Sequence, residues 1–243
     1  MTSLAGKGLR MLVLVLVMMI ITNIVMGEYP HPSAPTAMEN ISSTAPLPSI
    51  GAVQNVSGGT INVVNINVTT QTPRWKAFVG NITGKLALQN SQNQSIYEWD
   101  IISIEGEIYA TRYNGLINWD NIKCANQSNI DAEETALNIT PTSPDSINNT
   151  FNETSHAEFY AGTVHISANS CRSTALYVNG QKQSAKFQEV LLHDGSNLIY
   201  TGLLENSEVG YNGERYDYQL IVAENGLEGS QPSTAYYFYL ELI

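Results

Sequence analysis

The chain has 243 residues and a formal net charge of −11, with 22 acidic and 11 basic side chains. Nucleic-acid affinity depends on basic side chains that displace phosphate counterions, so a chain this acidic is not expected to bind nucleic acid. Charged residues make up only 14% of the sequence. Solubility therefore rests largely on Asn, Ser, Thr and Gln, a composition that favours an exported surface protein over a cytosolic enzyme.

The first 27 residues have the three parts of an export signal. Lys7 and Arg10 precede an apolar run over residues 11–26, and the small Gly27 follows it. We expect residues 1–27 to be a signal peptide that is removed before Glu28. A retained membrane anchor is the alternative, although its apolar run of about 16 residues is shorter than the ~20 that a spanning helix usually needs.

Both arrangements place the remainder of the protein outside the cell, either secreted or at the cell surface. Membrane contact is then expected only through residues 11–27, and only if the leader is retained. A third possibility is a pilin-type leader, because Gly6-Lys7-Gly8 resembles the site that archaeal prepilin peptidases cut. The prolines that follow argue against it, since they would interrupt the long helix through which such pilins polymerise.

Residues 28–59 contain five prolines among Ser, Thr, Ala and Gly. Such a segment buries too little apolar area to order itself. We therefore expect a disordered stalk, or linker, ahead of one folded domain over residues 60–243.

From Thr60 onward, apolar and polar residues alternate in short runs. In the first half these runs predict strands over residues 61–68, 75–79, 85–88, 96–99 and 107–111. Trp75 and Trp99 bracket the middle runs, and a large aromatic residue at each end favours a β-core. In the second half we expect strands over residues 159–168, 175–178, 186–193, 198–204, 216–222 and 235–242.

The turns and the missing helical periodicity indicate the fold class. Asn179-Gly180 and Asp194-Gly195 are hairpin signals. No amphipathic helical stretch is apparent after residue 60, and residues 113–157 are polar and turn-rich, which favours a long loop or insertion. The expected fold is all-β, an antiparallel β-sandwich of the Ig-like or jelly-roll-like kind, following an N-terminal hydrophobic leader helix and the disordered stalk.

Cys124 and Cys171 are the only two cysteines, 47 positions apart. In an oxidising compartment they predict one disulfide that closes a long loop and stabilises the fold by roughly 3 to 4 kcal/mol. Free thiols remain the alternative. A metal site is disfavoured, because no CxxC motif or paired histidine stands nearby.

N-glycosylation is the most specific signal in the sequence. Nine Asn-x-Ser/Thr sequons lack proline at the middle position, and none follows residue 154. Because a glycan is not buried, we expect the C-terminal third to supply core or contact surface. The nine positions are Asn40, Asn55, Asn67, Asn81, Asn93, Asn126, Asn138, Asn148 and Asn152.

Catalytic, cofactor and metal motifs are missing from the sequence, so no catalytic, cofactor-binding or metal-ligating residue and no cofactor is expected. There is no GxSxG, HExxH, P-loop or GxGxxG pattern. The histidines His31, His156, His165 and His193 form no pair at metal-binding spacing. Scattered carboxylates, among them Glu241, could pair across the fold as a glycosidase requires, but their spacing selects no pair.

Several stretches between residues 73 and 243 resemble uncharacterised archaeal secreted proteins, with a Trp-initiated glycine and sequon motif and an aromatic C-terminal strand. These stretches are WKAFVGNITGKLALQNSQNQSIYEW, NWDNIKC, FQEVLLHDGSNLIYTGLLEN, YDYQLIVAENG and YYFYLEL. The resemblance implies an exported β-rich envelope protein without an assigned reaction.

We therefore expect a non-enzymatic, glycosylated structural or adhesion protein of the cell surface, such as a filament or envelope subunit. Its expected partners are copies of itself or other envelope proteins, and residues 60–69 could add a strand to a neighbour's sheet. The alternative is an extracellular module that binds carbohydrate or small solutes through exposed tyrosines. A secreted hydrolase is the third hypothesis.

Overall fold

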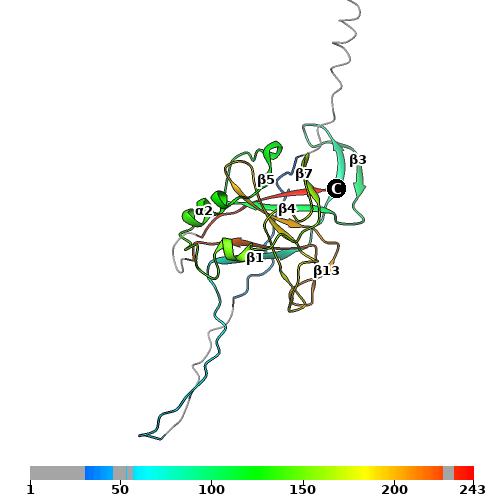
Figure 1. Ribbon diagram of the computed structural model, residues 1–243. Helices are drawn as coiled ribbons and strands as arrows, with labels where there is room; N and C mark the ends of the chain where they lie inside the picture. The colour runs from blue at the N-terminus through cyan, green and yellow to red at the C-terminus, as the bar shows by residue number, and fades with distance from the viewer. Residues whose placement is uncertain (1–30, 46–52, 54–56, 227–232) are drawn as a thin grey trace, which may run out of the picture. The chain divides into compact units, whose positions relative to one another are not determined.

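The computed structural model describes residues 31–45, 53, 57–226 and 233–243. The predicted leader over residues 1–27 lies outside the described residues. The chain divides into two units, residues 1–30 and 31–243, and the second unit contains every element below (Figure 1). Its elements are β1 (Trp75–Gly80), β2 (Lys85–Gln89), β3 (Ser95–Asp100), β4 (Gly106–Thr111), η1 (Trp119–Asn121), β5 (Lys123–Cys124), α2 (Gln127–Ala136), α3 (Ile147–Thr150), β6 (Phe159–Ala161), β7 (Val164–Ile166), β8 (Ser173–Thr174), β9 (Tyr177–Val178), β10 (Gln181–Lys182), β11 (Glu189–His193), β12 (Leu198–Leu203), β13 (Glu208–Val209), β14 (Arg215–Tyr216), β15 (Tyr218–Ala223) and β16 (Tyr237–Leu242).

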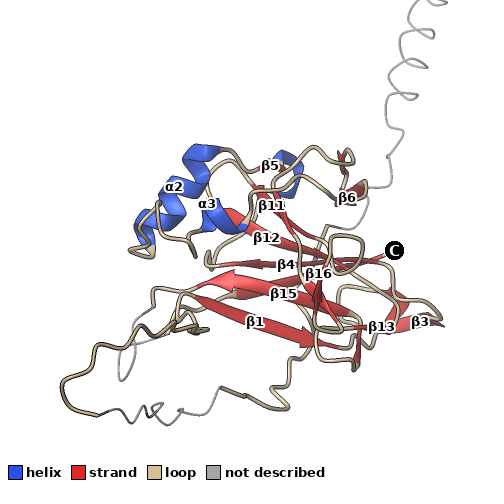
Figure 2. Cartoon of the chain, turned by 60° about the horizontal axis from the view of Figure 1, so that its bottom comes forward, coloured by secondary structure: helices blue, strands red, loops and turns tan. Residues whose placement is uncertain are grey.

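A six-stranded antiparallel sheet organises this unit. Its strand order is β16-β4-β12-β11-β5, and β8 also pairs with β11. Five further pairs, β1–β15, β2–β3, β6–β7, β9–β10 and β13–β14, are two-stranded and antiparallel. The prediction of an all-β, antiparallel chain is therefore confirmed (Figure 2).

The two central strands are buried on both faces. Every residue of β11 is buried, as are the first five residues of β12. Alternate side chains of a strand point to opposite faces, so Leu191 and Tyr200 join one apolar cluster while Leu192 and Ile199 join the other. The sheet therefore has a hydrophobic core on each side, which is why the two strands carry long apolar runs.

The β1–β15 ribbon packs on the face that carries Tyr200. The Trp75 ring lies 6.5 Å from that of Tyr200, and the Phe78 ring lies 5.0 Å from that of Phe238. The indole Nε1 of Trp75 donates a hydrogen bond to the Asp145 carbonyl oxygen at 2.8 Å. This tryptophan is thus a core residue, as its place at the start of a predicted strand suggests.

Residues 113–157 are not the loop that the sequence suggests. They contain η1, β5, α2 and α3, and the buried Ile130 and Ile147 lie in the same cluster as Tyr200. The sequence shows no amphipathic helical stretch after residue 60, yet α2 is a helix of ten residues. In α2 only Ile130 and Glu134 are buried, one turn apart. Because one of these two residues is charged, the helix shows no repeating pattern of apolar residues in the sequence. A capping box from Asn126 starts the helix.

The β-branched run over residues 61–68 forms no strand, contrary to the prediction. Its side chains face solvent, with Ile61 98% and Ile66 85% exposed. A strand needs a hydrogen-bonding partner, and the described residues provide none for this run.

The prediction of a disordered stalk over residues 28–59 does not hold at Ser33, which forms a β-bridge with Leu240. The Ser33 N–H donates to the Leu240 carbonyl at 3.0 Å, and the Leu240 N–H donates back at 2.8 Å. Pro32 beside it is buried. The edge strand β16 offers unpaired backbone groups, and these bind residue 33.

The predicted strands of the second half are confirmed with shorter bounds. Residues 159–168 divide into the β6–β7 hairpin, which turns at Gly162. Asn179 and Gly180 both have positive φ, 46° and 73°, and join β9 to β10 as their sequence predicts. Residues 194–197 connect β11 to β12, so that connection is longer than two residues.

The predicted disulfide between Cys124 and Cys171 is present, with the two Cα atoms 4.9 Å apart. Cys124 ends β5, and Cys171 precedes β8. β5 pairs with the last two residues of β11 and β8 with its first two, so the bond joins the two segments that pair with opposite ends of this strand.

Removing both cysteines, Cys124→Ala with Cys171→Ala, should lower the free energy of unfolding by roughly 3 to 4 kcal/mol, because the unfolded chain regains the freedom of a long loop. Urea unfolding at neutral pH measures this change. Equal midpoints for the oxidised wild type and the double variant would contradict the account.

Candidate functional site

The β2–β3 hairpin has one apolar face and one polar face. Leu86 lies opposite Trp99 across the two strands, and Leu88 lies opposite Tyr97. These four side chains, called here the hairpin apolar face, point to the same side of the ribbon. On the other side Lys85 forms an ion pair with Glu98.

The hairpin apolar face is exposed, which the sequence did not indicate. The exposed fractions are 47% for Leu86, 57% for Leu88, 59% for Tyr97 and 49% for Trp99. Trp99 is therefore not the core residue that its position at the end of a predicted strand suggests. Alternation identifies an amphipathic strand, but it does not show whether another layer covers the apolar side.

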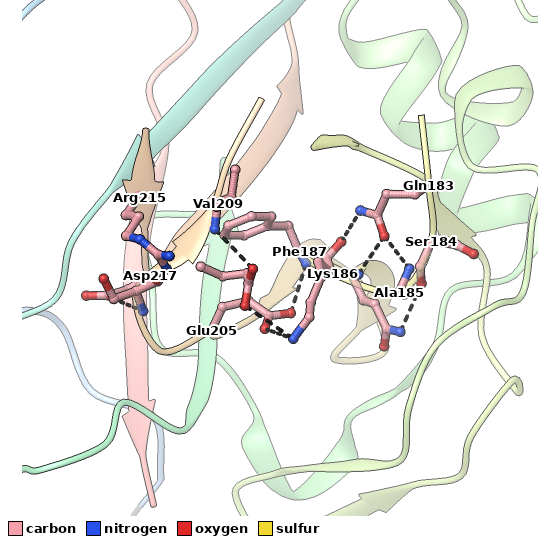
Figure 3. A network of polar contacts seen from close by, with 12 residues as sticks. Gln183, Ser184, Ala185, Lys186, Phe187, Glu205, Val209, Arg215 and Asp217 are labelled. Atoms are coloured by element: carbon pink, nitrogen blue, oxygen red, sulfur yellow. Dashed lines mark hydrogen bonds and ion pairs between the residues drawn. The ribbon is translucent and has the colours of Figure 1, made fainter. Parts of the chain in front are cut away.

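The base of the hairpin is fixed by Asp217. Its Oδ2 accepts a hydrogen bond from the Ile82 N–H at 2.7 Å, and its Oδ1 accepts one from the Ser207 N–H at 2.9 Å. Asp217 is 6% exposed, and Figure 3 shows it beside Arg215, whose Nη1 donates to the Ser207 carbonyl. The hairpin thus extends from an ordered base.

A second network holds the loop ahead of β11. Figure 3 shows Glu205 reaching Lys186 and Phe187: its Oε1 accepts from the Phe187 N–H at 3.0 Å, and its Oε2 lies 3.2 Å from the Lys186 ammonium. Phe187 has a positive φ of 49° and a fully buried side chain. Because its donors and acceptors are paired, this network explains the loop conformation without a ligand.

Two carboxyl groups meet on the edge of the main sheet. Glu107 of β4 lies directly opposite Glu241 of β16. The strands approach closely here because residue 106 is glycine with a φ of 128°; a Cβ atom there would lie 2.1 Å from the Glu241 carbonyl oxygen. Glu241 Oε2 accepts hydrogen bonds from Tyr109 Oη at 3.1 Å and from the Gly162 N–H at 2.9 Å.

Glu107 keeps its proton to a higher pH than an exposed glutamate does. It is 3% exposed, and its Oε2 has no hydrogen-bond partner among the described residues. Burial, and then the nearby Glu241, raise the pKa of Glu107 to about 8. Glu241 was among the carboxylates that the sequence suggested and Glu107 was not, although a glutamate that begins an otherwise apolar strand is a usable signal.

A carboxylic acid beside a second carboxyl group is the chemistry that glycosidases use. Here the acid is nearly closed to solvent, so a glycosidic oxygen would have no approach to it. We therefore interpret Glu241 as a structural residue that links β16 to β4 and to the β6–β7 turn, with Glu107 buried opposite it.

A small pocket of about 290 Å³ lies between α2, the end of β4 and the start of β12. Its charged wall is Arg112, which donates through Nε and Nη2 to the two oxygens of Glu133 at 2.6 and 2.8 Å. Ligand pockets usually have volumes of roughly 300 to 1,000 Å³ and are mostly apolar. This one is at the small end and is lined mainly by polar side chains, so it makes a poor ligand site.

The histidines have structural roles where their contacts are defined. His156 is buried, and its Nε2 accepts from the N–H groups of Ser170 and Cys171 at 3.1 and 2.9 Å, beside the disulfide. His193 Nδ1 accepts from the Gly195 N–H at 2.9 Å. Among the described residues, no three His, Cys, Asp or Glu side chains are grouped so as to hold a metal ion.

The sequon asparagines lie mostly on the surface. Seven of them are exposed: Asn40, Asn67, Asn81, Asn93, Asn126, Asn138 and Asn152. Asn126 caps α2 through its Oδ1, whereas a glycan would attach to Nδ2. Asn148 is half-buried, and its Oδ1 accepts from Arg172 at 3.0 Å. Asn55 lies outside the described residues.

No family model matches this chain, and no curated protein or solved structure is significantly similar to it. Within residues 31–243, as far as they are described, no helix is both long and apolar enough to cross a bilayer.

Replacing Asp217 by Ala should loosen the hairpin base, because the Ile82 and Ser207 N–H groups lose their acceptor. We expect the free energy of unfolding to fall by roughly 1 to 3 kcal/mol and hydrogen exchange to accelerate over residues 81–105. Asp100→Ala, at an exposed position on the hairpin, is the control. Equal exchange in the two variants would argue against the anchoring role.

The raised pKa of Glu107 makes stability depend on pH. The folded state holds a proton that the unfolded state releases near pH 4.5, so the free energy of unfolding should fall as the pH rises from 4.5 to 8. This loss should be roughly 3 to 5 kcal/mol and should be missing in Glu107→Gln. Denaturant unfolding across this range measures it, with exposed Glu105→Gln as the control. Parallel curves for Glu107→Gln and the wild type would contradict the assignment.

Proposed function

We propose that this chain is an exported, glycosylated and non-enzymatic structural or adhesion protein of the cell surface, serving as a filament or envelope subunit. The observation that carries the proposal is the exposed hairpin apolar face, presented from a base fixed by Asp217. An exposed apolar patch on an otherwise polar surface favours contact with another macromolecule. An enzyme needs a reaction centre that a substrate can reach. Glu107 is almost closed to solvent, and the pocket beside Arg112 is small and mostly polar.

Two further features support export. Both cysteines are used in the disulfide, a bond that forms and persists in oxidising compartments. Seven sequon asparagines have exposed side chains and so leave room for a glycan. These features agree with the leader-like composition of residues 1–27 and favour a protein that functions outside the cell.

The proposed architecture is a β-sandwich, with the six-stranded sheet as one layer and the β1–β15 ribbon as the other. Support comes from the aromatic contacts between the layers, Trp75 with Tyr200 and Phe78 with Phe238. Aligned sandwiches carry their loops and hairpins at the ends of the layers, where they are available for contacts.

A carbohydrate-binding module is the second candidate, favoured by the exposed Tyr97 and Trp99. Their ring centroids lie 4.8 Å apart, and exposed aromatic rings stack on sugars. The ring planes are tilted by 60°, so they do not form the flat platform that would suit a sugar best. A glycan array comparing wild type with Trp99→Ala separates the two candidates: binding that is lost in the variant would favour the module.

Intact-mass spectrometry of the native protein tests export directly. The full chain has a mass of 26.6 kDa. We expect loss of the mass of residues 1–27, addition of glycan mass, and a deficit of two protons from the disulfide. A native protein with the unmodified full-length mass and two reduced thiols would overturn the proposal.

Glycopeptide mapping should find glycans at exposed sequons and little or none at Asn148. The reason is space, because the Asn148 side chain is half-buried against Arg172. Asn152, four residues later and exposed, is the matched comparison. Equal occupancy at the two positions would contradict this assignment.

A further inference from the structure

The segment Thr60–Thr69, called here the orphan strand, has the β-branched composition of a strand but joins no sheet among the described residues. Within the described part of the chain, none of its backbone N–H groups has a hydrogen-bond partner. Its apolar side chains are exposed to a degree that is unusual for β-branched residues: 94% for Val63, 54% for Val64, 85% for Ile66 and 74% for Val68. Unpaired backbone N–H groups flanked by β-branched side chains usually pair with another strand.

Residues 64–68 of the orphan strand would be amphipathic when extended. Val64, Ile66 and Val68 would share one face, and Asn65 and Asn67 the other, which carries Ile61 and Val63 before this stretch. Asn67 heads a sequon, so a glycan there would lie on the polar face and away from the apolar one. The pattern suits a strand with one face against a protein and the other toward solvent.

The β2–β3 hairpin offers the matching surface. It is a two-stranded ribbon, so the outer edge of β3 has no neighbouring strand among the described residues. Tyr97 and Trp99 stand along this edge, on the apolar face. Aromatic and β-branched side chains are a favourable cross-strand combination, and a third strand stabilises a ribbon that is marginal alone.

The orphan strand and the hairpin flank β1 at opposite ends. The orphan strand precedes Trp75, where β1 begins, and the hairpin follows Gly80, where β1 ends. Six residues of strand separate these ends by about 17 Å, and Figure 2 shows β3 beyond the far end of β1. The orphan strand lies at one end of β1, and the strand edge that would accept it lies at the other end. This arrangement favours a head-to-tail contact between two copies.

The two contact surfaces add no charge repulsion of their own. Two chains of net charge −11 repel each other at long range, so a contact between copies has to be made through neutral surfaces. The orphan strand contains no charged residue, and the hairpin apolar face has none either. The charges on the hairpin, Lys85, Glu98 and Asp100, lie on its opposite face, where Lys85 pairs with Glu98.

We propose that the orphan strand of one copy adds to the outer edge of β3 in a second copy, so that Val64, Ile66 and Val68 lie beside Tyr97 and Trp99. This inference rests on the proposed function and names its partner. Because donor and acceptor are different surfaces, the contact is heterologous, and its repetition gives a ring or an open filament.

Cysteine cross-linking between copies tests the pairing. Full chains carrying Trp99→Cys are mixed with chains carrying Val64→Cys, Ile66→Cys or Val68→Cys, and disulfide-linked heterodimers are measured after mild oxidation. Neighbouring residues on one face of paired strands have Cβ atoms about 5 Å apart, so at least one of these mixtures should cross-link efficiently.

The matched controls are Val63→Cys and Asn65→Cys, which lie on the other face of the same segment. We expect their cross-linking yields to be at least tenfold lower. Equal yields on both faces, or links only between identical positions, would overturn the proposal, because neither fits a strand in register beside β3.

Sedimentation velocity adds a measurement that does not depend on cysteine. Ile66→Lys should weaken self-association at least tenfold, whereas Asn65→Lys should leave it near the wild-type value. Both variants should unfold at the wild-type temperature, because the segment contributes nothing to the folded core. A wild type that stays monomeric at high micromolar concentration would overturn the proposal.

Two other occupants of the hairpin apolar face would be recognised in the same set of experiments. Trp99-dependent sedimentation with phosphatidylcholine vesicles, without cross-links between copies, would assign the face to a membrane. A link within a single chain carrying both Ile66→Cys and Trp99→Cys, without heterodimers from the mixtures, would assign it to the chain's own strand. Either result would overturn the contact between copies while leaving the mass evidence for an exported glycoprotein intact.

Discussion

Burial of one sheet on both faces is the constraint on which this structure depends. The strands β11 and β12 have core on either side, with Leu191 and Tyr200 in one cluster and Leu192 and Ile199 in the other. The chain supplies both coverings itself, from the β1–β15 ribbon and α2 on one face and from η1 and the β6–β7 hairpin on the other. Strands enclosed in this way have no face left for a partner.

The same constraint explains what remains outside. With both faces of the main sheet covered, the apolar residues of the β2–β3 hairpin and of the orphan strand have no core to join. Trp99 is half-exposed and Ile66 almost fully so. Burial of such groups is favourable by roughly 1.5 to 3 kcal/mol for each large side chain. The folded unit therefore presents apolar surfaces that a neighbouring molecule could bury, which links its architecture to an assembly role.

The sequence predicted the β class, most strand positions and the disulfide, because these depend on local alternation, turn residues and a single cysteine pair. It could not predict which amphipathic strands are covered. Trp75 and Trp99 have similar surroundings in the sequence, yet only Trp75 packs against Tyr200. Helix α2 was also not predicted, because only Ile130 and Glu134 are buried in it and they form no apolar helical pattern. The position of Glu107 opposite Glu241 depends on the pairing of β4 with β16. That pairing joins distant parts of the chain, as the hydrogen bond from Tyr109 to Glu241, 132 residues later, shows.

Hydrogen–deuterium exchange at increasing protein concentration tests the central claim most directly, because it reports on the unaltered chain. If copies meet through the orphan strand and β3, amide exchange over residues 60–69 and 95–100 slows as the concentration rises, while exchange in β11 and β12 stays the same. Equal exchange over those two segments at every concentration would show that they remain unpaired, and it would contradict the account.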